Sequence, residues 1–222
     1  MSPLSAAGAS KRQTHPIGFN LAVIALAAAI CGLAFAYGID AIGRASRPAA
    51  GGSEMAVRSI ASRQLVIPSA WLRAGDESGT GFARQVALSV QVPLGPGGAL
   101  RQVDVTLMPR SRVRPSASLL DGVYLHEFMP DQVSGPPGLV GKPMMAADGF
   151  NHETVWYDAL SSSPFVAKCA APVAAGRPGR CLRAVYLGPG IAAVYGFDDD
   201  VLDNWATFDA HVQPLLVRIG AM

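Results

Sequence analysis

The stretch RQVALSVQVPLGPGGALRQVDVTLM, residues 84–108, decides the fold. Apolar and polar residues alternate over residues 84–94 and again over residues 100–108, which is the two-residue period of a half-buried strand. Glycine and proline fill residues 95–98 between them and are typical of a turn. The stretch therefore predicts an antiparallel hairpin. Its inward-facing side chains are expected to be Val86, Leu88, Val90, Val92, Val103, Val105 and Leu107.

Other short runs extend this sheet. Residues 181–187 and 191–197 enclose a Gly-Pro-Gly turn and predict a second hairpin. Residues 109–122 and 130–150 are rich in proline, serine or glycine, and we expect both to be loops. Apolar runs bounded by turn residues predict four further strands, at residues 64–68, 123–129, 153–158 and 165–169.

The chain ends in a predicted amphipathic helix. Apolar residues recur at spacings of three and four over residues 201–219. Asp198, Asp199 and Asp200 precede it, where carboxylates cap free amides and favour the positive end of the helix dipole. Pro214 has no amide hydrogen, so we expect it to kink or interrupt the helix. The predicted fold class is α+β, an antiparallel sheet with this C-terminal helix on its apolar face.

An apolar segment precedes the predicted sheet. Residues 17–39, IGFNLAVIALAAAICGLAFAYGI, carry no charge. A helix of this length spans about 35 Å, against about 30 Å for a bilayer core. We expect an uncleaved transmembrane signal anchor; the alternative is a signal peptide with basic Lys11 and Arg12, cleaved after Ala36. The expected organisation is a cytoplasmic tail (1–16), the transmembrane anchor (17–39), a linker with a short helix near Ser53 (40–62) and an extracytoplasmic domain (63–222).

Two cysteines outside this segment indicate the compartment. Cys169 and Cys181 flank a loop rich in proline, glycine and alanine, and a pair spaced in this way predicts a disulfide across a hairpin. The alternative is two unrelated buried thiols in a cytosolic domain. Because disulfides persist in oxidising compartments, we expect a single-pass protein of the inner (cytoplasmic) membrane with its C-terminal domain in the periplasm.

The composition excludes two broad classes. Half of the 222 residues are hydrophobic, 15% are charged, and the mean hydropathy is +0.28. Such a chain is too apolar and too weakly charged to be disordered. The formal net charge is +2 and the pI is about 8.5. Nucleic-acid-binding domains carry a clear basic stripe and a pI above about 9, so we expect no nucleic-acid partner.

The sequence shows no catalytic or metal-binding motif. His126 and His152 are each followed by glutamate, but neither begins an HExxH motif. A zinc site would require both to converge with a carboxylate such as Asp148. There is no G-x-S-x-G elbow and no phosphate-binding loop. We therefore expect no cofactor and no metal; the enzymatic alternative is an envelope hydrolase with a dispersed site that uses His126, Glu127, Asp148 or His152.

Four arginines form the most distinctive charge feature, namely Arg101, Arg110, Arg112 and Arg114. They predict a binding surface for an acidic partner or for lipid headgroups. The alternative is an ordinary solvated loop, because the chain uses 15 arginines against 3 lysines.

The order of several short motifs resembles a group of small, uncharacterised, single-span bacterial envelope proteins. The resemblance covers most of residues 63–216 and implies an anchored extracytoplasmic domain, with no known activity and no catalytic residues. The stretches that carry it are Leu65-Val66-Ile67-Pro68, Val103-Asp104-Val105-Thr106-Leu107-Met108-Pro109, Pro164-Phe165-Val166-Ala167-Lys168-Cys169, Cys181, and a helix with Trp205 and Asp209.

These observations lead to one main functional hypothesis. We expect a non-enzymatic, membrane-anchored periplasmic domain that binds another envelope protein through its sheet edge or its arginines. The first alternative is a small-molecule-binding sensor module under the 130–150 loop. The hydrolase with a dispersed site ranks below both.

Overall fold

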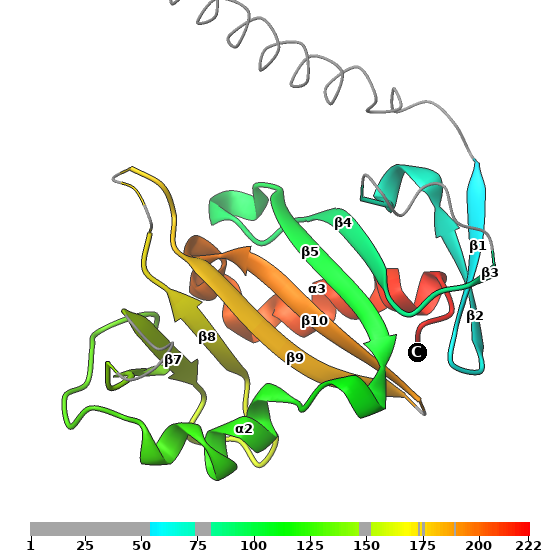
Figure 1. Cartoon of the computed structure of the whole chain (residues 1–222). Coiled ribbons are helices and arrows are strands. Elements are labelled where there is room, and N and C mark those ends of the chain that lie inside the picture. The colour runs from blue at the N-terminus through cyan, green and yellow to red at the C-terminus, as the bar shows by residue number, and fades with distance from the viewer. Residues whose placement is uncertain (1–53, 74–80, 147–151, 173, 175, 189) are drawn as a thin grey trace, which may run out of the picture. The chain divides into compact units, whose positions relative to one another are not determined.

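The hairpin of residues 84–108 is confirmed as β4 (Val86–Val92) paired antiparallel with β5 (Arg101–Pro109). It begins a seven-stranded antiparallel sheet with the strand order β4-β5-β10-β9-β8-β7-β6 (Figure 1). The structure is a computed structural model that describes residues 54–73, 81–146, 152–172, 174, 176–188 and 190–222. All of them belong to one compact unit, residues 50–222.

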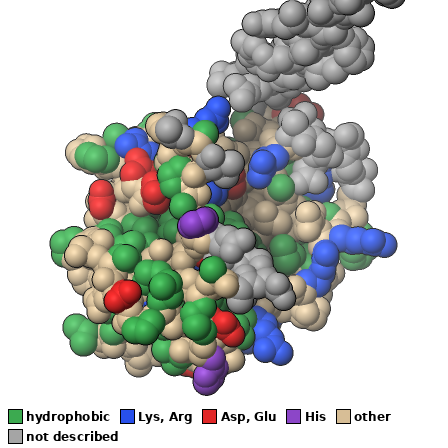
Figure 2. All heavy atoms as spheres, turned by 60° about the vertical axis from the view of Figure 1, so that its left-hand side comes forward, with side chains coloured by type: hydrophobic (Ala, Val, Ile, Leu, Met, Phe, Trp, Pro, Cys, Tyr) green, Lys and Arg blue, Asp and Glu red, His purple; other side chains and the backbone are tan. Residues whose placement is uncertain are grey.

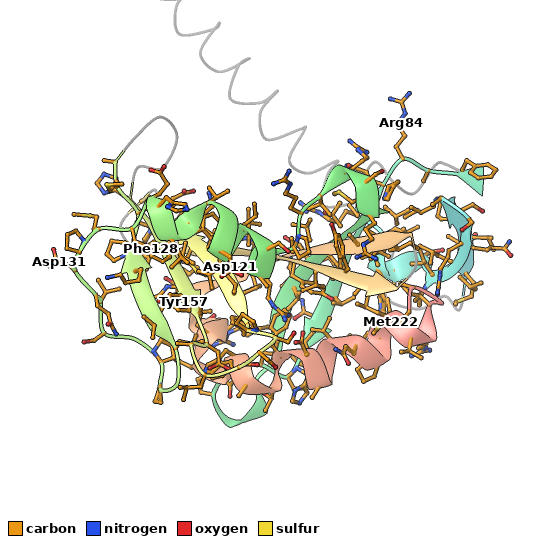
Figure 3. All side chains as sticks on the ribbon, turned by 90° about the horizontal axis from the view of Figure 1, so that it is seen from below. Arg84, Asp121, Phe128, Asp131, Tyr157 and Met222 are labelled. Atoms are coloured by element: carbon orange, nitrogen blue, oxygen red, sulfur yellow. A yellow bond between two sulfur atoms is a disulfide. The ribbon has the colours of Figure 1, made fainter. Side chains whose placement is uncertain are left out.

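The remaining strands and helices complete this unit. Within the large sheet they are β6 (Val140–Pro143), β7 (Glu153–Tyr157), β8 (Val166–Ala170), β9 (Arg180–Gly188) and β10 (Ile191–Asp198). A small second sheet consists of β1 (Met55–Ile60), β2 (Arg63–Pro68) and β3 (Gly81–Phe82). The helices are α2 (Ser116–Gly122) and α3 (Trp205–Arg218), which lie on opposite faces of the large sheet (Figures 1 and 3).

The main core lies between the large sheet and α3. Phe208 of α3 is fully buried, and its ring centroid lies 5.3 Å from that of Tyr195 and 5.1 Å from that of Phe197 on β10. Val212 and Leu216 follow Phe208 at the spacing of one helical face and are also buried. The alternating strands and the amphipathic helix therefore bury each other's apolar faces, as the sequence predicts.

An ion pair between a buried arginine and a half-exposed aspartate links α3 to the sheet. The Arg183 side chain on β9 is 8% exposed and donates two hydrogen bonds to the Asp209 carboxylate, at 2.5 and 2.8 Å. Its guanidinium carbon also lies 4.6 Å from the ring centroid of Phe165 and 5.6 Å from that of Phe208. Aromatic faces attract a guanidinium, so the charge is surrounded by groups that favour it.

The opposite face of the sheet is covered only in part. The α2 helix lies over β8 and β9, and the Ser116 hydroxyl oxygen accepts a hydrogen bond from the Ala184 amide at 2.8 Å. A second, smaller core forms beneath it from Leu120, Tyr124, Met144, Val155 and Val166.

Two local predictions in this region are wrong. Residues 116–122 were expected in a loop but form α2, and residues 123–129 were expected as a strand but contain the 3-10 helix Tyr124–His126. Leu120 on α2 and Tyr124 on the 3-10 helix both bury their side chains in the second core, against strands that are distant in the sequence. Strands also occur in two stretches expected to be irregular: β6 within residues 130–150 and β1 within the expected linker 40–62.

The aspartates before α3 do not cap it. The helix begins at Trp205, preceded by the 3-10 helix Asp199–Asn204, and no side chain caps either helix. Each carboxylate instead contacts another segment: Asp198 accepts from Arg180 at 2.9 Å, Asp199 from the Gly179 amide at 3.0 Å, and Asp200 from Arg101 at 2.6 Å. Pro214 lies inside α3, which continues to Arg218 without interruption.

The fold class expected from the sequence needs one correction. Its α+β sheet domain with a C-terminal helix is confirmed, but the N-terminal transmembrane helix is not part of the described structure. A membrane span needs about 20 apolar residues. In the part of the chain that the structure describes, no helix is long and apolar enough, since α2 has 7 residues and α3 has 14. Residues 17–39 lie outside the described residues.

We predict that Asp209→Ala lowers the free energy of unfolding by about 2 kcal/mol, because Arg183 then remains buried without its partner. Urea unfolding monitored by fluorescence measures the change. Asp203→Ala is the control, since Asp203 is exposed and its removal should shift stability by no more than about 0.5 kcal/mol. The double variant Arg183→Met/Asp209→Leu should recover most of the loss. Equal stability of Asp209→Ala and wild type would contradict this role.

Candidate functional site

The structure does not bring the four predicted arginines together. Arg101 is the first residue of β5, whereas Arg110, Arg112 and Arg114 follow the last one, so the strand separates them by about 27 Å. Arg101 is also only 31% exposed and pairs with Asp200, with 2.6 Å between Nε and Oδ2. Arg101 therefore ties β5 to the segment before α3 and does not belong to a surface with the other three.

Arg110, Arg112 and Arg114 lie near another arginine, Arg84, which no sequence motif marks. Arg84 precedes β4, which pairs with the end of β5, and the Arg112 Nη1 donates to the Arg84 carbonyl at 3.3 Å. The antiparallel pairing of residues 84–94 with residues 100–108 already implied this proximity. Figure 3 shows Arg84 projecting away from the sheet. We call Arg84, Arg110, Arg112 and Arg114 the arginine surface.

All four residues of the arginine surface are exposed. The guanidinium carbon of Arg110 lies 3.7 Å from the ring centroid of Tyr186, which holds that side chain on the outer face of β9. Across the described ranges, none of the four has a carboxylate within 4.0 Å. Their charges are therefore not compensated by ion pairs with the described part of the domain.

At the opposite end of the sheet, the arginines are paired with carboxylates. Asp104 on β5 pairs with Arg180 and lies 3.7 Å from Arg73. Arg180 also pairs with Asp198 at 2.9 Å. Arginines at this end are thus matched by carboxylates, so they offer less free positive charge to a partner than the arginine surface does.

The predicted disulfide is present. Cys169 on β8 and Cys181 on β9 lie directly opposite each other in the strand register and are bonded. Both are buried against the main core. The bond closes the base of the loop that joins the two strands, 12 residues apart in the sequence.

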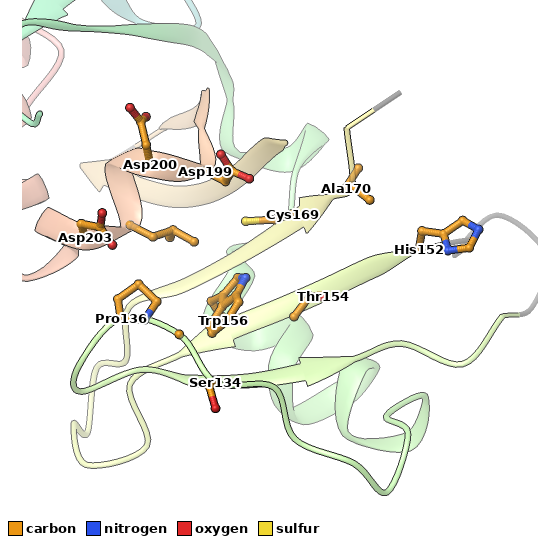
Figure 4. Close-up of a pocket in the computed structure, with 13 residues that line it drawn as sticks. Ser134, Pro136, His152, Thr154, Trp156, Cys169, Ala170, Asp199, Asp200 and Asp203 are labelled. Carbon is orange, nitrogen blue, oxygen red and sulfur yellow. The ribbon is translucent and has the colours of Figure 1, made fainter. Parts of the chain in front are cut away.

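A groove of about 340 Å³ lies between β7, β8 and the segment before α3 (Figure 4). Trp156 and Thr154 lie on one side of it, and Asp199, Asp200 and Asp203 lie on the other. The groove borders the residue 130–150 segment, which we expected to cover a small-molecule site, because Ser134, Gly135 and Pro136 also line it.

Glycines allow that segment to lie flat on two tryptophans. A Cβ atom at Gly135 or Gly141 would overlap the ring of Trp156. A Cβ at Gly138 would lie 2.9 Å from the Trp205 ring, whose Nε1 donates to the Pro137 carbonyl at 3.0 Å. Of the three glycines, Gly135 lines the groove itself, on the side of Trp156.

The residues considered for catalysis do not form an acid–base pair. His126 and His152 are both exposed, and Asp148 lies outside the described residues. Glu127 and His152 lie on different segments with residues 143–145 between them, and no hydrogen bond of the described structure joins their side chains. Among the described residues, no group of three histidines, cysteines, aspartates or glutamates could hold a metal ion.

Two buried tyrosines are also unsuitable as bases. Burial raises the pKa of the Tyr195 phenol far above its ordinary value. Burial also raises the pKa of Tyr124, and the nearby Glu153 carboxylate adds to the effect. Both phenols therefore stay protonated at neutral pH.

Comparison with known proteins gives one likeness in structure. The chain is similar in fold to an immunity protein of the Stenotrophomonas maltophilia type IV secretion system, with a TM-score of 0.51 and 12% sequence identity. The alignment covers 78% of this chain and 97% of that protein. No family model and no curated protein matches the chain. At this level of identity, the likeness concerns the fold alone.

We predict that Gly141→Ala lowers the free energy of unfolding by about 1–3 kcal/mol, because its Cβ would collide with the Trp156 ring. Gly122→Ala is the matched control, since a Cβ there meets nothing within 4 Å and φ is not positive. Chemical denaturation of both variants measures the difference. A Gly141→Ala protein as stable as Gly122→Ala would show that the segment does not lie against Trp156.

Proposed function

We propose that this domain is a non-enzymatic binding module of an oxidising, extracytoplasmic compartment, and that its arginine surface binds an acidic surface of another protein. One observation carries the proposal: Arg84, Arg110, Arg112 and Arg114 gather at one end of the sheet, exposed and without carboxylate partners among the described residues.

The chemistry of this surface suits a protein partner. Arginine and tyrosine are enriched in protein interfaces, and the Arg110–Tyr186 stack presents both together. Guanidinium groups bind carboxylates through two parallel hydrogen bonds, and a cluster of like charges accelerates encounter with an acidic partner. The strands β4 and β5 hold Arg84 and Arg110 on a rigid support, which reduces the entropy lost on binding.

The fold likeness supports the same class of function. A protein with this fold is described as an immunity protein of a secretion system, which is a binding role and not a catalytic one.

The disulfide supports the extracytoplasmic compartment. Cytosolic thiols are kept reduced, whereas a buried bond such as Cys169–Cys181 persists where the surroundings are oxidising. By the chain-entropy estimate, closing this loop stabilises the fold by about 3 kcal/mol.

We predict that reversing three charges, Arg84→Glu, Arg112→Glu and Arg114→Glu, abolishes binding of the native partner. Site-specific photocrosslinking in the source cells, with the crosslinker at Ser111, identifies that partner by mass spectrometry. Binding of the purified partner should weaken steeply between 50 and 200 mM salt, because the screening length falls about twofold over this range. The affinity of an apolar interface would not show this dependence.

Arg177→Glu is the matched control for this test. Arg177 is also exposed, but it lies in the β8–β9 loop at the opposite end of the sheet. Its reversal should leave the affinity unchanged. A partner that binds the triple variant as tightly as wild type, or that has no acidic surface, would refute the docking proposal.

We also predict that Cys169 and Cys181 resist alkylation, even in the denatured chain, until a reductant is added. Protein taken directly from cells into denaturant and iodoacetamide, with and without prior reduction, is analysed by mass spectrometry. Two alkylated cysteines at these positions without reduction would place the domain in a reducing compartment.

A further inference from the structure

Three short segments near β7 are joined by backbone hydrogen bonds. These segments have no part in the proposed function. Backbone hydrogen bonds link residues 127–129 to residues 143–145, and residues 143–145 to residues 152–154. The donor–acceptor distances are 2.9 Å from the Met129 amide to the Pro143 carbonyl, 2.7 Å from the Met145 amide to the Glu127 carbonyl, and 2.9 Å from the Met144 amide to the Glu153 carbonyl.

Successive side chains of these segments point to opposite faces of the sheet that the segments form. Met144 is 3% exposed and belongs to the second core, where Phe128 packs beside it. The neighbours of these two residues must face the other way. Met129 and Met145 therefore share the outer face of their segments, and His152 lines the same groove beside them.

The three side chains line one groove of about 370 Å³. Met129 is 39% exposed and Met145 is 40% exposed, although methionine is usually buried. Hydrophobic side chains gather on the side of the molecule that carries β7 (Figure 2). Two thioethers and an imidazole thus line one accessible groove.

The donor set of this groove is soft. Thioether sulfur selects Cu⁺ among the biological metal ions, and imidazole nitrogen is a good ligand for copper. The carboxylate that borders the groove, Glu153, is already paired with Lys168 at 2.8 Å. We propose that Met129, Met145 and His152 form a binding site for a Cu⁺ ion.

The backbone holds the three residues in place. The Met129 and Met145 amides are bonded to neighbouring segments, and the His152 carbonyl accepts from the Ala171 amide at 3.0 Å. His152 also has a φ of 59°, a left-handed conformation that is uncommon for residues other than glycine. Ligands on hydrogen-bonded segments lose little freedom when a metal binds.

The test uses the full chain and Ag⁺, a probe that shares the ligand preference of Cu⁺ and needs no reductant. Cys31→Ser serves as the background, because a free thiol would bind Ag⁺ as well. Calorimetric titration in a nitrate buffer should show one Ag⁺ per chain. Met129→Leu, Met145→Leu and His152→Gln should each weaken binding by about tenfold or more.

Met222→Leu is the matched control. Met222 is 39% exposed, like Met129, but is the last residue of the chain and lies far from Phe128 (Figure 3). Its replacement should leave the affinity unchanged. In protein labelled with ¹³C at the methionine methyl groups, Ag⁺ should shift the signals of Met129 and Met145 and not that of Met222.

Either of two results would overturn the site: no binding of Ag⁺ by the Cys31→Ser chain, or binding that the three groove substitutions and Met222→Leu affect equally. Far-ultraviolet circular dichroism of each variant confirms that the fold is retained. The arginine surface lies on other elements, so the outcome for one proposal does not depend on the other.

Discussion

The ion pair between Arg183 and Asp209 is the constraint on which the arrangement of this domain depends. A guanidinium that is 8% exposed in the middle of a sheet is costly unless it is paired, and its partner stands on α3. The pair therefore favours the observed placement of α3 on the sheet. That placement brings Phe208 onto Tyr195 and Phe197. It also sets the position of the 3-10 helix immediately before α3, whose aspartates border a groove.

A sheet with one long helix has a second face to cover, and this domain covers only part of it. The α2 helix and the small second core protect β8 and β7, whereas polar side chains occupy the same face of β5. The division explains why the two candidate surfaces are separate. The arginine surface follows the ends of the uncovered strands, and the methionine and histidine groove lies on segments attached to the covered ones.

The sequence predicts features that depend on neighbouring residues and misses those that depend on distant partners. Alternation of apolar residues locates both hairpins, and two cysteines at a loop indicate their disulfide. The aspartates before α3 were assigned to capping because their true partners, Arg101 and Arg180, are distant in the sequence. The sequence also suggests that Arg101 lies near Arg110, because only nine positions separate them. The straight strand β5 places them at opposite ends of the sheet.

The methionine and histidine groove also depends on partners that are distant in the sequence. No motif in the sequence marks Met129, Met145 and His152, because only the pairing of three segments places them on one face. A metal held by all three would link these segments and could bind only when they are assembled. By mass action it would stabilise the folded β6–β7 region in proportion to the logarithm of metal concentration. A site of this kind would make the stability of the β6–β7 region depend on the metal concentration of the surroundings. It would involve no catalytic step.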